Sequence, residues 1–414
     1  MVSMTENQGA TATFRFLHTS DWQLGMPTKY LDQEARARFA EARLTAVEKL
    51  FALADERECE AIVVAGDVFD DNLLRPEVYR RAMDVLRRSP VPVFLLPGNH
   101  DPFDAASIYR KPEFAELAEG SDSGAAVVVL DDSTPRVVRD GERGCVEIVG
   151  APLLTKKPNE DLVAKAIAEC AQRDDQGADI RVLVGHGNVN SFGDVFDLSQ
   201  IDVATAERAC ADGVIDYVAL GDTHSAMKLG TKGTVWYSGA PEVTAFLEPH
   251  GGGENNSGKA LVVDITAGDG SDAAEVQVEE VHVGQWAFIA LEAEINSRED
   301  AEAFVEKLND LPHKRTTVAK YALRGTVDLD TAAWMDEQIA DISLGFARLY
   351  ARERLMDLHV VPEMDELAEA NFGEGFVDAA ASELLERARN EEQAASDALR
   401  LLYRLSSSVR KEGA

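Results

Sequence analysis

The sequence predicts an α/β sheet fold, and two features of residues 14–100 indicate it. Short, apolar and β-branched runs, such as residues 61–65, are typical of strands that are buried on both faces of a sheet. Between these runs lie longer segments in which apolar residues recur at helical spacing, as they do across residues 31–57. Strands and helices therefore alternate along the chain, which is the pattern of an α/β sheet.

The predicted elements continue in this way through the first two thirds of the chain. Helices are expected at residues 31–57, 76–88 and 160–173, where apolar residues alternate with charged ones at helical spacing. A Gly-rich loop at residues 251–258 separates two of the later strands and is expected to be flexible. The expected strands cover residues 14–17, 61–65, 91–96, 125–130, 145–149, 180–184, 216–220, 235–237, 261–263 and 276–283.

The pattern changes near Gly284, after which a small α+β module is predicted. Residues 372–405 are charged, rich in Ala, Leu and Glu, and helical in pattern. These helices either pack on their own domain or dock a partner helix, and the sequence supports both readings about equally. The module is expected to contain strands at residues 286–295 and 317–323 and helices at residues 299–308 and 331–342.

The composition is that of a soluble globular protein with a large core. The chain has 414 residues, of which 45% are hydrophobic and 28% are charged. We find no apolar segment long enough to cross a bilayer and no signal peptide. The four cysteines are widely spread without a CxxC pair, which favours reduced thiols in a cytoplasmic protein. Residues 1–12 are small and polar, so we expect a disordered lead-in.

Polar residues with metal-binding side chains follow five of the predicted strands. Ligands collect at the carboxyl ends of strands in open α/β folds, so these side chains are expected to lie together. A single residue of this kind is more often a hydrogen-bonded turn residue than a ligand, but five strand ends in sequence reverse that expectation. The residues are Asp21 and Gln23, then Asp67, then Asn99 and His100, then His186, and finally Asp222 and His224.

Such a set of carboxylates, amides and imidazoles suits two divalent metal ions. Two-metal sites hold their ions about 3.5–4 Å apart, bridged here by one carboxylate and a hydroxide that would be the nucleophile. The ions lower the pKa of that water and clamp the attacking and leaving oxygens. This is the chemistry of phosphate-ester hydrolysis, in which positioning and charge neutralisation supply most of the rate.

The motifs at these strand ends also resemble those of a known family. Gly-Asp-x-x-Asp at 66–70, Gly-Asn-His-Asp at 98–101, Gly-His at 185–186 and Gly-x-x-His at 221–224 look like the calcineurin-like metallophosphoesterases. Within that family, His-Thr-Ser-Asp-Trp-x-Leu-Gly at 18–25 and Gly-Asp-Val-Phe-Asp at 66–70 are most similar to the SbcD/YhaO branch of DNA repair exonucleases.

The resemblance implies a domain organisation for the whole chain. The family's fold is a four-layer α-β-β-α sandwich, and the resemblance covers residues 13–284. Residues 285–345 lie where this branch carries a capping domain, and residues 346–414 form a C-terminal helical region able to dock a partner.

The resemblance also implies a role for each residue of the site. Asp21, Gln23, Asp67 and His224 would hold one metal ion, and Asp67 (bridging), Asn99, His186 and Asp222 would hold the other. His100 would be the catalytic residue that is not a ligand, acting on the scissile phosphate or the leaving oxygen. Asp101 would orient its ring, as carboxylates often do for a functional imidazole.

Two positions depart from the family's pattern, because Gln23 and Asp222 stand where the family generally has His. One reading is a degraded, inactive site. However, Gln and Asp both offer oxygen donors, which favour harder ions such as Mn²⁺ or Mg²⁺. Asp222 also adds negative charge, which should make the bound water less acidic. We therefore expect a preference for Mn²⁺ and an alkaline optimum.

The formal net charge of −33 opposes a protein that grips DNA alone, since such proteins are usually basic. A generally acidic proteome, a partner that supplies the DNA contacts, or a substrate other than DNA would each explain it. Lys314, Arg315 and Lys320 form one of the few basic stretches. A solvated face is the default reading of this stretch, and a DNA-phosphate contact is the alternative.

Three functions remain open at this point. The leading hypothesis is a metal-dependent subunit of a DNA exonuclease or endonuclease, which the resemblance pairs with an SbcC-like coiled-coil ATPase. The second is a phosphodiesterase acting on a nucleotide or another small phosphodiester. The third is a non-catalytic scaffold that docks the ATPase. The sequence leaves a homodimer open and gives no reason to expect a membrane.

Overall fold

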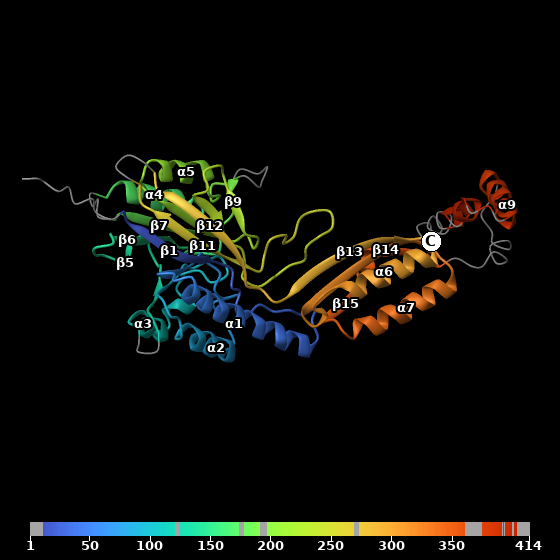
Figure 1. The fold of residues 1–414 in the computed structure, drawn as a ribbon, viewed down its shortest axis with the longest axis horizontal. Helices are drawn as coiled ribbons and strands as arrows, with labels where there is room; N and C mark the ends of the chain where they lie inside the picture. Colours follow the sequence, from blue (N-terminus) through green and yellow to red (C-terminus); the bar gives the residue numbers. More distant parts are fainter. Residues whose placement is uncertain are drawn as a thin grey trace, which may run out of the picture. The chain divides into compact units, whose positions relative to one another are not determined.

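The computed structural model divides into two compact units (Figure 1). The first unit comprises the chain up to Ala245 together with Gly253–Trp286, and the second comprises Phe246–Gly252 and the chain from Ala287 onwards. The residues that the structure describes are 11–120, 124–173, 178–190, 197–268, 273–360, 375–390, 392, 394–399 and 401–403.

The first unit contains two six-stranded sheets. In the first sheet, β1 to β4 run parallel, and β11 and β12 extend it antiparallel beside β1. Its order is β12 (Glu275–His282), β11 (Lys259–Thr266), β1 (Thr13–Thr19), β2 (Ala61–Val64), β3 (Val93–Leu95) and β4 (Val127–Val129).

The second sheet has a parallel centre formed by β6, β7, β8 and β10, with an antiparallel strand at each edge. Its order is β5 (Arg136–Arg139), β6 (Val146–Ala151), β7 (Ile180–His186), β8 (Tyr217–Gly221), β10 (Val235–Tyr237) and β9 (Met227–Leu229).

Alternating side chains place the two sheets face to face. Phe16 and Val63 point into a core that also contains Ile148 and Val182 of the second sheet. The neighbouring positions, such as Ile62, belong to a separate core beneath the helices of the first sheet. Because successive strand residues point to opposite faces, both faces of the first sheet are covered. The predicted four-layer α-β-β-α sandwich is confirmed.

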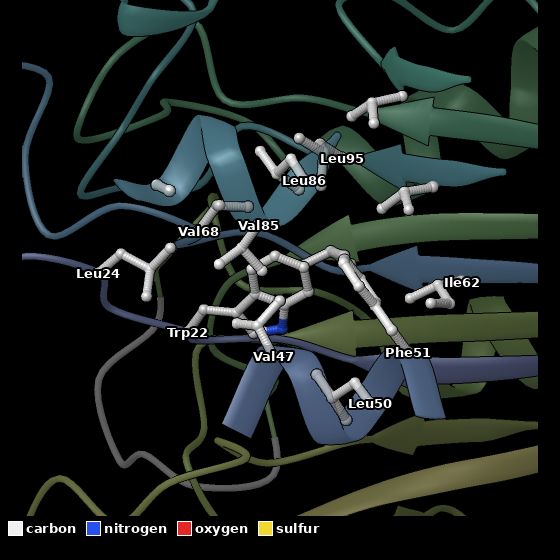
Figure 2. Packing of buried hydrophobic residues seen from close by; sticks show 14 of the residues in the cluster. Trp22, Leu24, Val47, Leu50, Phe51, Ile62, Val68, Val85, Leu86 and Leu95 are labelled. Carbon is white, nitrogen blue, oxygen red and sulfur yellow. The ribbon is translucent and has the colours of Figure 1, made fainter. Parts of the chain in front are cut away.

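The outer layers are helices. Figure 2 shows Trp22 packed beside Val47, Leu50 and Phe51 of α1. On the first sheet lie α1 (Gln33–Glu56), α2 (Pro76–Leu86), η1 (Ile108–Arg110) and α3 (Pro112–Ala118), and on the second lie α4 (Leu162–Ala171) and α5 (Val203–Ala211).

Several of these helices begin at an aspartate. Asp32 accepts a hydrogen bond of 2.8 Å from the amide of Ala35, and Asp161 caps α4 and Asp202 caps α5 in the same manner. Such caps satisfy backbone donors that have no partner inside the helix. Among the described residues, every helix is too short or too polar to span a bilayer.

The second unit is built on a parallel sheet whose central strand is β14 (Thr317–Val327). β13 (Ala287–Ile295) pairs with one edge of β14, while β15 (Arg348–Ala351) and β16 (Asp357–Val360) pair with it at successive positions. An apolar core lies between the sheet and its two helices. The helices are α6 (Arg298–Asp310) and α7 (Leu329–Ser343), and the short turns η3 (Lys314–Thr316) and η4 (Glu353–Leu355) complete the module.

The small module therefore ends later than the predicted boundary at residue 345. β15 and β16 belong to its sheet, although their side chains are half-buried and partly charged and carry no apolar run. In the C-terminal region the structure describes α9 (Phe376–Arg389) and helical residues at 394–399 and 401–403. Ala381 and Leu399 are buried there. The rest of the predicted helical segment, and most of the lead-in at 1–12, lie outside the described residues.

Candidate metal centre

Four of the predicted ligands have an unusual backbone conformation. The φ angles are 53° at Asp21, 49° at Gln23, 53° at Asp67 and 99° at Asp222. Residues with side chains seldom adopt positive φ, and those that do cluster at functional sites, where surrounding contacts hold them. Here Asp21 donates its amide to the carbonyl of Gly66, and Gln23 donates to the carbonyl of Asp67, both at 3.0 Å. The first two strand-end loops are thereby fixed to each other.

Two motif glycines allow these loops to approach closely. A Cβ atom on Gly98 would lie 2.2 Å from Oδ1 of Asp67, and one on Gly66 would lie 2.2 Å from Nδ1 of His186. Neither distance is sterically allowed, so any side chain would push the ligand away. The glycines of Gly-Asp-x-x-Asp and Gly-Asn-His-Asp are therefore required by the packing of the site.

Asp21, Asp67 and His186 form the centre of the site. They are buried, and one potential ligand atom from each lies within 4.8 Å of the others. Oδ1 of Asp21 has no hydrogen-bond partner, although it is buried. Its Oδ2 accepts from Ser20 at 2.5 Å and from the amide of Asp222 at 3.2 Å. An unpartnered buried carboxylate oxygen is costly unless a cation satisfies it.

The ring of His186 is oriented as a metal ligand. Its Nδ1 lies 2.8 Å from the carbonyl oxygen of Ala65, which accepts a hydrogen bond and leaves the Nε2 lone pair free. Nε2 then faces Oδ1 of Asn99 at 2.8 Å, Asp67 at 3.5 Å and Asp222 at 3.7 Å. The side-chain amide of Asn99 also lies against the carboxylate of Asp67. The imidazole, the amide and the two carboxylates thus converge on one point, as the ligands of a divalent cation do.

His224 is oriented by side chains instead. Its Nδ1 lies 2.9 Å from Oε1 of Glu254 and also contacts the hydroxyl of Thr244. Glu254 is itself buried and accepts the amide of Thr244 at 2.9 Å. Nε2 of His224 points towards Asp21, whose Oδ1 is 3.7 Å away. This is the carboxylate–histidine arrangement that commonly supports a metal ligand.

The pKa values of the metal-free centre also show that its carboxylates attract positive charge. Burial lowers the pKa of His186, but Asp67, Asp21 and Asp222 more than compensate and raise it to about 9. For His224, burial is again outweighed, by the hydrogen bond to Glu254 and the charge of Asp21, and the pKa rises to about 9. Burial raises the pKa of Asp21. Protons thus occupy positions where metal ions would neutralise the carboxylates.

His100 lies beside this cluster and remains accessible. Its side chain is 43% exposed, and Nε2 lies 4.0 Å from Oδ2 of Asp67. Its Nδ1 lies 2.9 Å from the carbonyl oxygen of Asp70, which accepts its proton and leaves Nε2 free for a substrate. The backbone amide of His100 donates to Oδ1 of Asp67 at 2.9 Å.

The prediction that Asp101 orients His100 is wrong. The carboxylate of Asp101 accepts from the amides of Gly98 and Phe69, at 2.8 and 2.9 Å, and from the hydroxyl of Tyr109 at 2.6 Å. These bonds join the 98–101 turn to the loop after β2, and the carbonyl of Asp70 orients the ring in its place. Burial and the charge of Asp67 raise the pKa of Asp101 to about 7 against the lowering effect of these hydrogen bonds.

The structure brings the seven predicted ligands to this edge of the sheets, but Gln23 differs from the expectation. Its Nε2 donates to Oδ2 of Asp67 at 2.9 Å, so the nitrogen and not the oxygen of the amide faces the carboxylate. Asp222 is half-buried with Oδ1 directed to His186. Gln23 therefore acts here as a hydrogen-bond donor, and metal binding through its oxygen would require the amide to rotate.

The predicted basic stretch is largely engaged within the second unit. Nζ of Lys320 lies 2.6 Å from Glu248 and 4.0 Å from the centre of the Phe246 ring. Lys314 donates to the carbonyl of Asn309. Arg315 remains exposed. Lys320 is thus engaged in an internal ion pair, and the DNA contact of this stretch stays a prediction.

Several residues that support the site were not predicted. Glu254 lies in the Gly-rich loop, which the sequence marks as flexible, and it bonds to a histidine thirty positions earlier. Thr244 and Tyr109 have similar roles and lie outside the motifs, while Asp70 ends Gly-Asp-x-x-Asp but acts through its main-chain carbonyl. Contacts of this kind depend on how distant loops fold together, so a single sequence gives no sign of them.

Comparisons with known proteins agree with this geometry. The family model described as calcineurin-like phosphoesterase matches residues 14–226. The chain is 26% identical over 255 residues to the SbcD subunit of the nuclease SbcCD from Escherichia coli K12, covering 56% of this chain and 62% of that protein. The corresponding Bacillus subtilis protein is 24% identical over 261 residues, covering 56% and 63%. The alignments thus span less than two thirds of these relatives.

Two solved structures match part of the chain at low identity and low structural similarity. A 5'-nucleotidase precursor from Thermus thermophilus is 15% identical, covering 65% of this chain and 54% of that one, with a TM-score of 0.32. A dimetal phosphatase from Danio rerio is 11% identical, covering 64% and 98%, with a TM-score of 0.36. These scores are too low to add to the argument.

Proposed function

This chain belongs to the calcineurin-like phosphoesterase family, and we propose that within it the protein is a two-metal phosphodiesterase that cleaves DNA. The family makes it a metal-dependent phosphoesterase. The choice of DNA is supported by the relatives named as a nuclease subunit. The observation that carries the proposal is the convergence of Asp21, Asp67 and His186 on one buried point.

We propose that this set holds two divalent ions, with Mn²⁺ favoured over Mg²⁺. Two such ions, when bound, lower the pKa of a coordinated water and neutralise charge on the phosphate. Asp67 would be the carboxylate shared by both ions, since each of its oxygens faces groups of the site. Asp21 and His224 would complete one ion's shell with the Gln23 oxygen, and Asn99, His186 and Asp222 would complete the other.

The residues of the chain then have separate tasks. The backbone bonds of the strand-end loops keep the carboxylates in place before substrate arrives. His100 donates from Nδ1 to a backbone carbonyl, which leaves Nε2 able to carry a proton to the leaving oxygen. Its exposure fits a group that touches substrate, whereas the buried His186 does not.

A second candidate is hydrolysis of a nucleotide or another small phosphodiester. The formal net charge of −33 favours it, because a polyanionic strand is repelled by an acidic surface. A partner that supplies cationic contacts would remove this objection. Hydrolysis of a small phosphodiester is therefore the second candidate, after the nuclease.

We propose that the partner is an SbcC-like coiled-coil ATPase and that the C-terminal helices dock it. The relatives are named as one subunit of a nuclease called SbcCD. Phe376, at the start of α9, is 86% exposed, and Val377 and Leu401 are also exposed. If co-purification with such an ATPase is unchanged by Phe376→Glu, these helices are not the docking element.

The function is tested with the full chain in Mn²⁺ beside His100→Ala. Single-stranded DNA, double-stranded DNA and bis-p-nitrophenyl phosphate are the substrates. Cleavage of DNA that is lost on substitution supports the nuclease. Hydrolysis of the small diester with intact DNA supports the second candidate. Inactivity towards all three substrates, with no metal bound, would leave a non-catalytic scaffold.

A further inference from the structure

A cavity of about 310 Å³ lies in the first unit beside α1 and α2. Its wall includes Leu24 and Gly25, the two residues that follow the predicted ligand Gln23. Gly25 has a φ angle of 99°, which residues with side chains seldom adopt, and a Cβ atom there would also displace the side chain of Leu74. The cavity is therefore formed by the same loop that leads into the metal centre.

The lining of this cavity is strongly basic. No acidic residue is found among its lining residues, on a chain with 74 acidic and 41 basic side chains. A local excess of cations against the overall charge indicates that an anion is accommodated here. The cationic lining residues are Lys29, Arg36, Arg43, Arg75 and Arg81.

Arg43 is the buried member of this group. It is 3% exposed and donates to the carbonyls of Trp22 at 3.0 Å and Val243 at 3.3 Å. It also contacts the sulfur of Met26 at 3.2 Å, and the buried carboxylates Glu242 and Glu254 act on its charge from further away. Its Nε has no hydrogen-bond partner within the described part of the chain although it is buried, which leaves one guanidinium donor open to an anion. Trp22 lies between Asp21 and Gln23, so Arg43 also ties the cavity to the ligand loop.

The exposed cationic residues differ in whether they already form hydrogen bonds or ion pairs within the protein. Arg36 donates to three backbone carbonyls of the loop that precedes α1, and Arg81 pairs with Glu41. Lys29 and Arg75 are exposed, and the described residues include no salt-bridge or side-chain hydrogen-bond partner for either. These two side chains are free to meet a ligand at the cavity rim.

We propose that this cavity binds a phosphate group of the DNA strand, next to the segment that is cleaved at the metal centre. The inference rests on the proposed nuclease function. Guanidinium groups present donors that match phosphate oxygens. Phosphates recur at regular intervals along a strand. When one phosphate is held at the metal centre, another phosphate of the same strand can therefore occupy the cavity. The cavity gives an acidic protein a local grip on an anionic substrate.

The test is binding of a fluorescent single-stranded oligonucleotide to the full chain in Mn²⁺, in a His100→Ala background that prevents cleavage. Lys29→Ala with Arg75→Ala should weaken binding roughly tenfold at low salt. The slope of log affinity against log salt should become less negative by about 0.7, since each phosphate neutralised on a single strand contributes about 0.7. Arg43 is left unchanged, because it also supports the ligand loop.

Arg80→Ala is the matched control, since Arg80 is an exposed cation on α2 that does not line the cavity. It should bind as the parent does. Equal binding by the parent and the rim variant overturns this inference alone. If the parent binds no oligonucleotide, the cavity assignment fails, whereas the nuclease proposal is decided by the cleavage assay with the three substrates. If binding of inorganic phosphate depends on Lys29 and Arg75 but binding of the oligonucleotide does not, the cavity binds a free ion and the assignment to a DNA strand is overturned.

Discussion

His186 and His224 both enter the metal centre from the second sheet, but they are held in different ways. His186 ends β7, is fully buried, and bonds through Nδ1 to a backbone carbonyl of the first sheet. His224 follows β8, is 28% exposed at its side chain, and is held by Glu254 and Thr244. One half of the centre is thus fixed by the main chain and the other by side chains.

The orientation of His186 is therefore set by the main chain, whereas the orientation of His224 depends on side chains that substitutions can change. No substitution removes the carbonyl of Ala65, so the orientation of His186 persists as long as the two sheets stay packed. The orientation of His224 depends on one carboxylate in a loop that begins with Gly251, Gly252 and Gly253. The His224 half should therefore respond to substitution of its hydrogen-bond partners, whereas the partner of His186 is a main-chain carbonyl that no substitution removes.

The largest effect is expected where the two halves meet. Asp67→Asn removes the charge shared by both ions while keeping the shape of the side chain. The rate of bis-p-nitrophenyl phosphate hydrolysis should fall on the order of a thousandfold. Asp84→Asn, a neutralised exposed carboxylate on α2, should have no effect. A modest loss confined to one bound ion would mean that Asp67 does not bridge the halves.

Glu254→Gln should affect the His224 half alone. The amide keeps the size of the side chain but removes the charge that supports the imidazole. The affinity for one Mn²⁺ ion should fall about 10- to 100-fold, which is typical when a supporting partner is lost. The affinity for the other ion should stay unchanged in the same titration. Equal weakening at both ions would contradict the comparison.

A third histidine, His18, should change the stability of the protein with pH in the opposite direction to His186 and His224. His18 is buried between the sheets against Tyr217 and the carbonyl of Leu220, and burial lowers its pKa to about 3. Below about pH 6.5, His18 is protonated in the unfolded chain but stays neutral in the folded chain. The folded state is therefore destabilised relative to the unfolded state as the pH falls below about 6.5. Metal-free His186 and His224 act oppositely, with stability present below 6.5 and lost as pH rises through about 9.

His18→Gln removes this term. Between pH 7 and pH 5, the free energy of unfolding of the wild type should fall by about 2 kcal/mol more than that of the variant. Chemical denaturation of both proteins at the two pH values measures the difference. If the free energies of unfolding of the wild type and the variant differ by the same amount at both pH values, His18 takes up its proton equally well in the folded and unfolded states, and the account of His18 is wrong.

The smallest effect is expected from restoring the family's residue at Asp222. Asp222→His removes a negative charge from the His186 half, so the bound water should become more acidic. The alkaline optimum should move down on the order of one pH unit, and the preference for Mn²⁺ should weaken. Profiles of rate against pH with Mn²⁺, Mg²⁺ and Zn²⁺ test this. If neither property changes, the departure from the family's pattern has no chemical role.

The sequence predicts the parts of the fold that rest on local pattern. The buried runs at residues 61–65 and 180–184 are strands because apolar, β-branched residues leave few alternatives. β5, β9, β15 and β16 were not predicted, since they are short and mix charged with apolar residues. Edge and half-buried strands are fixed by their neighbours and not by their own composition.

The same distinction applies to the site. Asp21, Asp67 and His186 were predicted because motifs place them at strand ends. The role given to Asp101 failed because the nearest acceptor for His100 is a backbone carbonyl, which any residue at position 70 would provide. Glu254 was missed because a buried partner thirty residues away has no local pattern.

Titration of Mn²⁺ into the metal-free full chain tests the central claim most directly. Two ions should bind per chain. At neutral pH their binding should release protons, because His186 and His224 have pKa values of about 9 without metal. Calorimetry in two buffers of different ionisation enthalpy measures both quantities, and Asp67→Asn should abolish the two-ion stoichiometry. No binding, or two ions that bind unchanged to Asp67→Asn, would contradict the account.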